Sequence, residues 1–458
     1  MSNNNTPELN CQITPRVTLV GLGVKIRQLG ILKTIAGYVK IEQKTVKDSP
    51  LDKLTDALVT ILAGGQGVVE ANTRLRSDPA LQRAFGRDRC AEQSVISETL
   101  TACTASNVAQ LEQASQAIYQ AHSGGYRHDY DTYWQVLEVD LSGQPCGPKA
   151  AFASKGYFAH QRNRRGRQLG RVYATLYDEV VVDQLYPGQT TLPMVLQELV
   201  SRAAQVLELT EAKRRRTILR IDGHGGSQDD VNWLLEQGYQ LHTKEYCGQR
   251  ARQLAASVIT WSDDPRVPDR QVGWVTLPTT EYIAPVKRIA VRTRKRNGQW
   301  GVGVIVSTLP GALVRLLTGC HPDQADPLTT LLAYVYFYDQ RGGGIEIGLK
   351  QDKQGLGVTK RNKKSFEAQQ MLTQLNALGH NLLIWGRDWL AERCPAVANF
   401  GLVRLIRDVL CLNGGVFFDD QTLATLVLKY YDRFSYQLGL ALRSLLEPWQ
   451  IAVILDKV

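Results

Sequence analysis

The densest group of chemically active side chains in the chain lies between Tyr338 and Lys353. Glu346, Lys350 and Lys353 are spaced i, i+4 and i+7, so on a helix they would share one face. Metal-dependent phosphate chemistry requires this combination, because a carboxylate holds a divalent cation while Arg and Lys bind phosphate oxygens. Taken alone, the same spacing also fits a solvated helix with a Glu–Lys ion pair. Carboxylates elsewhere in the chain decide between the two interpretations.

Two aspartates follow stretches that are typical of short β-strands. Residues 135–140 form an apolar run that ends in Asp140, with a turn expected over 141–145, and residues 217–223 place Asp222 in the same way. The full order predicted is strand 135–140, strand 171–176, strand 179–185, helix 192–207, strand 217–222, helix 229–237 and strand 239–243.

That order is the one of an RNase H-like mixed sheet, in which the strands that carry Asp140 and Asp222 lie side by side. A single aspartate at the end of a strand would be a turn cap. Two of them, together with Glu346 from a later helix, would form a site for two divalent cations about 3.5–4 Å apart. His224, beside Asp222, is expected to form hydrogen bonds in its loop rather than bind metal.

These stretches resemble the DDE-type transposases of bacterial insertion sequences, in the group whose third acid lies in a Tyr-Arg-Glu-Lys signature. The resemblance covers most of the chain and includes the segment 365–385 downstream. Tyr338-x2-Arg341 and Glu346-x6-Lys353 follow the family pattern, but four residues separate Arg341 from Glu346 where the family has three. The extra residue falls in a Gly triplet, which is a poor helix start, so we expect the helix to begin only at Ile345.

The resemblance implies a mechanism and a set of site residues. Asp140, Asp222 and Glu346 would hold two Mg²⁺ ions, with Mn²⁺ as a substitute, that activate water and later a DNA 3′-hydroxyl for attack on a phosphodiester. Phosphates beside the cleavage site would be bound by Tyr338, Arg341, Lys353 and, as a helper, Lys350.

The long interval between Asp222 and Glu346 predicts an insertion rich in β-structure. Asn297-Gly298 is a strong two-residue hairpin signal between apolar runs, and Arg292, Arg294 and Arg296 alternate on one of them. This basic face suits a DNA backbone, although a charged edge strand is an equally good interpretation. Family members with such an insertion use a tryptophan to stack on a flipped base; the candidates here are Trp300, then Trp274 and Trp261. Packing across the hairpin is the alternative role.

The charge balance is strongly basic. The chain of 458 residues has 54 Lys and Arg against 44 Asp and Glu, a net charge of +10, which suits a polyanionic partner. Basic runs at 162–167, 213–216 and 360–364 flank the predicted catalytic strands and the Glu346 helix. Each alone could be a solvated surface; together they favour a nucleic-acid channel with salt-sensitive binding.

The two ends of the chain are expected to be helical. Helices are predicted over 17–40, from Ser49-Pro50 to Gly64, and from Asp78-Pro79 onwards. The Ser/Thr-rich segment 93–100, near Arg74, Arg76, Arg83, Arg87 and Arg89, could serve as a DNA-recognition helix or merely pack. In the tail, helices are expected at 402–412, 421–428 and 436–446, with a terminal strand at 451–455.

Cysteine usage and hydropathy indicate the compartment. The 8 cysteines are scattered without a Cys-x-x-Cys pair, which argues against a disulfide framework or a zinc site. The first residues contain no apolar signal segment, and no apolar run is long enough to cross a bilayer. These features predict a soluble intracellular protein, and the resemblance implies that it acts on DNA in the bacterial cytoplasm.

The interpretation as a whole is an α/β protein with an RNase H-like mixed sheet flanked by helices and interrupted by a β-rich insertion. The segments expected are a helical N-terminal DNA-binding region (1–124), the first part of the catalytic domain (125–245), the insertion (246–330), the second part with the Glu helix (331–392) and a helical tail (393–458). The function predicted is cut-and-paste transposition of the chain's own insertion sequence. The partners would be double-stranded DNA with terminal inverted repeats, target DNA and a second copy of the chain, without a membrane or small-molecule substrate.

Two other functions fit the same residues. One is a structure-directed metal nuclease of the same fold, which would cut strands without joining them. The other is an inactive transposase derivative that only binds specific DNA, an alternative that the irregular Arg341–Glu346 spacing keeps open. Terminal inverted repeats and a short target duplication around the gene would distinguish a mobile element's enzyme from both.

Overall fold

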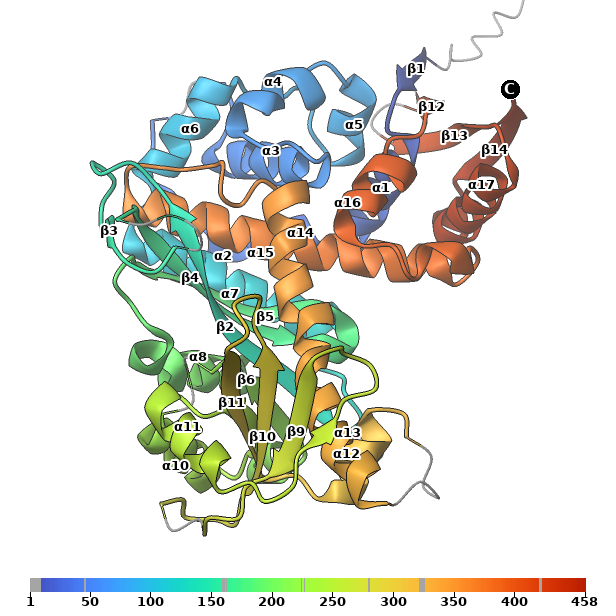
Figure 1. Ribbon diagram of the computed structural model, residues 1–458. Coiled ribbons are helices and arrows are strands. Elements are labelled where there is room, and N and C mark those ends of the chain that lie inside the picture. Colours follow the sequence, from blue (N-terminus) through green and yellow to red (C-terminus); the bar gives the residue numbers. More distant parts are fainter. Residues whose placement is uncertain are drawn as a thin grey trace, which may run out of the picture. The chain divides into compact units, whose positions relative to one another are not determined.

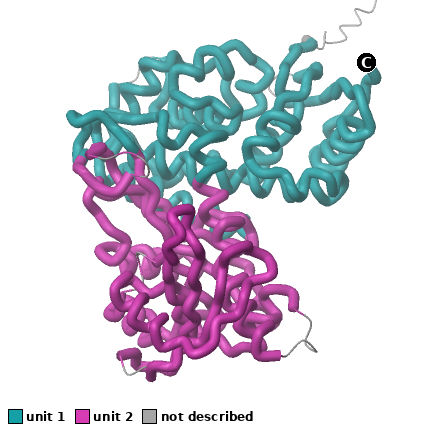
Figure 2. The backbone as a smooth tube through the Cα atoms, in the orientation of Figure 1, with its two compact units in different colours: residues 1–123, 145–153, 350–458 teal, residues 124–144, 154–349 magenta. Residues whose placement is uncertain are grey.

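The computed structural model describes residues 10–44, 47–158, 161, 163–223, 225, 227–278, 281–320, 326–419 and 422–458. By internal contacts the chain divides into two compact units (Figure 2). Unit 1 consists of residues 1–123, 145–153 and 350–458, and unit 2 of residues 124–144 and 154–349. The last boundary along the chain, between residues 349 and 350, falls inside α14 (Ile345–Gly355), so the predicted segment 331–392 contributes to both units. The division into five segments stays a prediction.

The centre of unit 2 is a mixed sheet with the predicted strand order. The neighbours run β5-β4-β2-β6-β7, in which β2 and β6 are parallel, β6 and β7 are parallel, and β4 and β5 are antiparallel. This arrangement confirms the RNase H-like sheet and the adjacency of the two strands that precede the aspartates. The bounds are β2 (Gln135–Pro145), β4 (Arg165–Ala174), β5 (Glu179–Pro187), β6 (Thr217–Ile221) and β7 (Gln240–Lys244), with the short β3 (Ser154–Lys155) beside β4.

The predicted insertion continues this sheet instead of forming a separate one. Strand β11 (Trp300–Ser307) pairs antiparallel with β7, and β10 (Lys287–Arg294), β9 (Arg270–Trp274) and β8 (Ser262–Asp263) follow in order (Figure 1). The hairpin β10–β11 is confirmed, but its turn is longer than predicted. Lys295 N–H donates to the carbonyl of Gln299, and Gly298 has a φ of +79°. This is the three-residue loop in which a glycine with positive φ follows a tight turn.

Helices cover this sheet, and one of them is buried on all sides along most of its length. Helix α13 (Pro327–Asp339) begins at an Asp326 cap with Pro at its first position. Its residues from Leu331 to Tyr338 are all buried and form one core with residues of β6, β9, β10 and β11. A helix that is apolar around its whole circumference belongs inside a protein. The other helices of unit 2 are α8 (Leu192–Val206), α9 (Glu211–Arg215), α10 (Gln228–Glu236), α11 (Gly248–Ala256) and α12 (Gly311–Leu317).

Unit 1 is mainly helical, as predicted for the N-terminal region. The long α15 (Phe366–Ala391), capped by Ser365, is largely buried and contacts α3, α6, α7 and α17. Ser49 closes a capping box on α3, and Asp78 caps α5 with Pro79 at its first position. The helices of this unit are α1 (Val17–Gln28), α2 (Ile31–Tyr38), α3 (Pro50–Leu62), α4 (Ala71–Arg74), α5 (Pro79–Ala84), α6 (Gln93–Ala102), α7 (Ala105–His122), α15, α16 (Leu402–Arg404) and α17 (Arg433–Leu446).

Unit 1 also contains a small sheet that corrects one prediction. Its order is β1-β12-β13-β14, built from β1 (Asn10–Thr14), β12 (Gly414–Asp419), β13 (Thr422–Tyr430) and β14 (Ala452–Lys457). The helix predicted over 421–428 is wrong, because β13 pairs along its length with a strand on each side. Its leucines and alanine suggested a helix, but pairing with distant segments overrides local preference. The predicted terminal strand is confirmed by β14.

Among the described residues, no helix is both long enough and apolar enough to cross a membrane.

Because residues Leu331 to Tyr338 of α13 are buried in one core, we expect this core to dominate the stability of unit 2. Phe337 is 2% exposed, and Phe337→Ala should lower the free energy of unfolding by about 3–5 kcal/mol, because it leaves a cavity in this core. The measurement is urea denaturation followed by circular dichroism. Leu328→Ala, in the first turn of the same helix but 41% exposed, is the control and should change stability by less than about 0.5 kcal/mol. Equal losses in the two variants would contradict the described packing.

Candidate active site

Asp140 and Asp222 lie next to each other at one edge of the parallel strand pair. The register pairs Val139 of β2 with Ile221, the last residue of β6, and each aspartate is the next residue in the chain. One expectation was wrong: β2 does not turn away after Asp140 but continues to Pro145. Only its pairing with β6 stops there, since β6 ends at Ile221. The two carboxylates are therefore neighbours although they are far apart in sequence.

Glu346 is brought to the same place by the segment that follows α13. A 3₁₀ turn over Gln340–Gly343 connects α13 to α14, and α14 begins at Ile345 as predicted. Glu346 is thus the second residue of α14. Three acids from two strands and one helix come together in unit 2.

The guanidinium of Arg341 lies among these three carboxylates. Its Nη2 is 3.3 Å from Asp140 Oδ2, and its Nη1 is 3.2 Å from Asp222 Oδ1 and 3.8 Å from Glu346 Oε1. The Arg341 side chain is only 3% exposed, whereas those of Asp222 and Glu346 are 36% and 55% exposed. The acid cluster therefore opens to solvent on the side of Glu346 and is closed by the arginine on the other.

Burial and charge act in opposite directions at this cluster. Burial raises the pKa of Asp140 to about 6, against the opposing effect of the Arg341 charge. Burial also disfavours the guanidinium, but the neighbouring Tyr338, Asp140 and Asp222 raise the pKa of Arg341 above its ordinary value. Arg341 is therefore a permanent cation that offsets the repulsion among the acids.

Two further side chains complete the surroundings of Asp222. The Tyr338 hydroxyl donates to Asp222 Oδ1 at 3.2 Å and accepts from Arg341 Nη1 at 3.3 Å. Lys244 Nζ lies 4.2 Å from the centre of the Tyr338 ring, and burial lowers the pKa of Lys244. Lys244 was not singled out from the sequence. Its signal was its place at the end of β7, the strand that neighbours β6.

The donor set fits hard divalent cations, although the side chains are not disposed around one. Carboxylates such as these three, which all contact the Arg341 guanidinium, provide the oxygen ligands that Mg²⁺ and Mn²⁺ prefer. Among the residues described, however, no group of three or more His, Cys, Asp or Glu side chains is arranged to hold a metal ion. The Arg341 guanidinium contacts the same carboxylate oxygens that a cation would need. Its charge compensates the acids in their present arrangement.

The other predicted DNA-contacting residues lie on α14 and on the hairpin. Lys350 and Lys353 are on the second half of α14, as predicted, in the part that belongs to unit 1. Their contact with DNA stays a prediction.

On the hairpin, Arg292 is held between two tryptophans. Its guanidinium lies 4.2 Å from the Trp261 ring centre and 4.6 Å from that of Trp300. Trp300 is 41% exposed, whereas Trp274 packs edge-on against Tyr334 in the core. Of the three candidates, Trp300 thus presents the most accessible ring at the end of the hairpin.

The predicted row of three arginines on one strand is shorter in the structure. Arg294 is exposed at the end of β10, but Arg296 lies beyond the strand, in the turn. Both are exposed to solvent, so the tip of the hairpin is basic.

The basic runs include side chains that serve the fold. Arg167 and Arg361 are buried, and Arg361 donates to the carbonyl of Leu356 and to Asn376. Arg216 stacks on Trp134 at 4.5 Å. In this structure these three side chains are engaged within the protein and do not present their charges to a DNA phosphate. The basic runs therefore give less support to a nucleic-acid channel than predicted. Arg162 and His224 lie outside the described residues.

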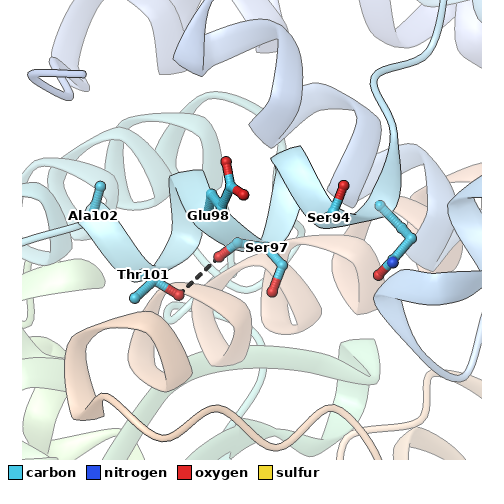
Figure 3. A pocket seen from close by; sticks show the side chains of 6 residues that line it. Ser94, Ser97, Glu98, Thr101 and Ala102 are labelled. Atoms are coloured by element: carbon cyan, nitrogen blue, oxygen red, sulfur yellow. Dashed lines mark hydrogen bonds between the residues drawn. The ribbon is translucent and has the colours of Figure 1, made fainter. Parts of the chain in front are cut away.

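The predicted recognition helix α6 presents a polar face. Ser94, Ser97, Glu98 and Thr101 line a depression of about 590 Å³ in unit 1 (Figure 3), and Ile96 and Leu100 of the same helix are buried. The arginines near this helix are largely neutralised by acids of the chain: the ion pairs are Arg74–Glu70, Arg76–Glu92, Arg87 with Asp48, Asp52 and Asp56, and Arg89–Asp48. Binding of DNA by α6 stays a prediction, and the nearby arginines do not support it because acids of the chain neutralise most of them.

One family of known proteins matches most of the chain. The family model described as "Transposase DDE domain group 1" matches residues 18–407. The chain belongs to this family. The match contains Asp140, Asp222 and Glu346, and it supports a DNA transposase over the two alternative functions.

Among solved structures, a similar one is described as "Cryo-EM structure of piggyBac transposase synaptic complex with hairpin DNA (SNHP)". The sequence identity is 11% and the TM-score is 0.44, over 88% of this chain and 82% of that one. No curated protein matches the sequence.

The site geometry predicts that Arg341 stabilises the transposase in the absence of metal. Arg341→Gln in a buffer with chelator should lower the free energy of unfolding by about 3 kcal/mol, since it leaves neighbouring carboxylates uncompensated. Urea denaturation measures the loss. Combining it with Asp140→Asn should restore part of the stability, because one of the repelling charges is then removed. If the double variant is no more stable than Arg341→Gln alone, the charge compensation described is wrong.

Proposed function

We propose that this transposase cuts and joins DNA at the ends of its own insertion sequence, with Asp140, Asp222 and Glu346 as the reacting site. The observation that carries the proposal is the convergence of these three acids, from two neighbouring strands and one helix, on a single guanidinium. Membership in the transposase family supplies the reaction class.

The three carboxylates would hold two Mg²⁺ ions, for which Mn²⁺ could substitute. Bound there, the cations would lower the pKa of a water or of a DNA 3′-hydroxyl and stabilise the negative charge on the leaving oxygen. The carboxylates that would hold the cations are the ones that contact the Arg341 guanidinium. Arg341 donors freed from these carboxylates would be available to bind a DNA phosphate.

The remaining residues of the site would orient the DNA. The Tyr338 hydroxyl, which donates to Asp222 in this structure, would change partner and donate to the phosphate beside the cleaved bond. Lys244, close to the same ring, adds a positive charge at the edge of the site. Lys350 and Lys353, farther along the Glu346 helix, would bind the DNA backbone beyond the cleavage point.

The β10–β11 hairpin would form a second contact with DNA. Arg294 and Arg296 are exposed at its tip and suit backbone phosphates. Trp300 would stack on a base displaced from the duplex, and Arg292 holds its ring on one side. The partners proposed are double-stranded DNA with terminal inverted repeats, a target DNA and a second copy of the chain, in the bacterial cytoplasm.

The proposed function predicts metal-dependent cleavage that requires each acid. DNA carrying the repeats that flank the gene should be cut at the repeat boundary with Mg²⁺ or Mn²⁺ but not with chelator. Asp222→Asn and Glu346→Gln should each reduce the cleavage rate by about 100- to 1,000-fold or more, because charge that develops at the phosphate is no longer stabilised. The measurement is a gel assay of cleaved ends.

Binding to the same DNA, measured by filter retention, is the control for folding and should persist in both variants. Strand joining would appear as covalent linkage of cut ends to a target plasmid. Cleavage without any joining would favour a metal nuclease. Tight, salt-sensitive binding without cleavage under any divalent metal would favour an inactive DNA-binding derivative and contradict the proposal.

The hairpin contact predicts a change in salt dependence. Arg294→Gln should reduce the slope of log K against log salt concentration by about 1, since one phosphate contact is lost. Fluorescence anisotropy with labelled repeat DNA at several salt concentrations measures the slope. Arg407→Gln, which removes an exposed arginine paired with Asp408, is the control and should leave the slope unchanged. An unaltered slope in Arg294→Gln would exclude this contact.

A further inference from the structure

A buried ion pair lies directly behind the acid cluster. Arg220 Nη2 is 2.5 Å from Glu138 Oε1, and the two side chains are 2% and 0% exposed. They belong to β6 and β2, where they are register partners, so both side chains point to the same face of the sheet. Each precedes an acid of the site by two residues: Glu138 comes before Asp140, and Arg220 before Asp222. Side chains alternate along a strand, so each member of the pair shares a face with the acid that follows it.

The same pair also holds the segment that brings Glu346 to the site. Glu138 Oε2 accepts the backbone N–H of Ile345 at 2.5 Å, and Arg220 Nη1 donates to the carbonyl of Phe337 at 2.7 Å. Phe337 is near the end of α13, and Ile345 is the first residue of α14. One ion pair is therefore bonded to both ends of the connection that contains Tyr338 and Arg341.

The backbone at Gly344 fits against this carboxylate so closely that no side chain has room there. A Cβ at Gly344 would overlap with the Glu138 carboxylate, whereas a Cβ at Gly342 or Gly343 would meet nothing within 4 Å. The extra residue between Arg341 and Glu346 lies in this triplet. The chain absorbs it in the 3₁₀ turn, and Gly344 lets the start of α14 rest directly on Glu138.

Because both charges of the Glu138–Arg220 pair are buried, the cost of removing them from water offsets much of their attraction, and a contribution to stability alone does not explain the pair. The side chains of Glu138 and Arg220 are 0% and 2% exposed, so the charged forms of both are disfavoured where they lie. Buried ion pairs are often replaceable by apolar side chains without loss of stability. An apolar pair could not accept the Ile345 N–H, however, which as the first amide of a helix has no acceptor within the helix.

We propose that Glu138 and Arg220 are positioning residues that set the place of Glu346 relative to Asp140 and Asp222, with Gly344 as the point where the helix start meets them. This inference rests on the proposed function, because it takes the three acids as the reacting site. Glu138 and Arg220 themselves do not contact the substrate: they act through the backbone of the α13–α14 connection.

The test compares matched variants of the full chain for Mn²⁺ binding, followed by the electron paramagnetic resonance of free Mn²⁺, and for single-turnover DNA cleavage. Gly344→Ala should weaken Mn²⁺ binding by about tenfold or more and slow cleavage by about 100-fold, since displaced supporting groups cost this much. Gly343→Ala, in open space one residue earlier, should change both by less than about twofold.

A second matched pair separates positioning from simple stability. Glu138→Gln should weaken Mn²⁺ binding in the same way, because a Gln side chain cannot accept from both Arg220 and Ile345 with its two terminal atoms. Asp183→Asn disrupts the equally buried Arg171–Asp183 pair between β4 and β5, whose atoms are 2.6 Å apart. It should lower the melting temperature by a similar amount but leave the affinity for Mn²⁺ within about twofold.

Hydrogen exchange of the wild-type chain provides a measurement that needs no variant. The Ile345 amide should exchange slowly although it is at the start of a helix, where amides are ordinarily unprotected. Rapid exchange at Ile345, or Mn²⁺ affinities of Gly344→Ala and Glu138→Gln that equal those of their controls, would overturn the positioning role. If these results overturned the positioning role while the wild-type chain still bound Mn²⁺ and cut DNA in the binding and cleavage assays, the proposed function would still stand. A wild-type chain that did neither would overturn both.

Discussion

The structure of the site depends on how the negative charges of three carboxylates are compensated in a partly buried place. Like charges about 4 Å apart near a protein surface repel by about 4 kcal/mol, so acids gathered at one point need a cation. In this chain the cation is the Arg341 guanidinium, within 3.8 Å or less of Asp140, Asp222 and Glu346. The concentration of negative charge makes the cluster suitable for divalent cations. When no cation is bound, the same charge requires a positive side chain of the protein beside it.

The rest of unit 2 serves to hold this arrangement. Helix α13 is anchored by its buried residues from Leu331 to Tyr338, so the position of Arg341, two residues after its end, is set by the core. The Glu138–Arg220 pair ties both ends of the following connection to the two strands that precede the aspartates. The insertion strands β9 to β11 extend the sheet and form one side of the α13 core. The insertion is thus part of the support of the site and not only a candidate DNA contact.

Local sequence patterns predicted most of the fold and which element brings each acid to the site. The strand order and the start of α14 at Ile345 followed from apolar runs, glycines and caps. What failed depended on distant partners: β2 continues past Asp140, and residues 422–430 form a strand because two other strands pair with them. The burial of Arg167 and Arg361 could not be read from basic runs, because a charge pattern does not reveal which member finds buried acceptors. Lys244 and the Glu138–Arg220 pair were missed for the same reason, as their roles arise only where β2, β6 and β7 lie side by side.

The most direct test of this site is to locate Mn²⁺ by anomalous scattering in crystals of the transposase bound to the DNA of its own terminal repeats. We expect manganese bound by Asp140, Asp222 and Glu346, with the Arg341 guanidinium no longer paired with all three carboxylates. Manganese bound elsewhere, with Arg341 still in contact with all three acids while the DNA is cut in the same crystals, would contradict it.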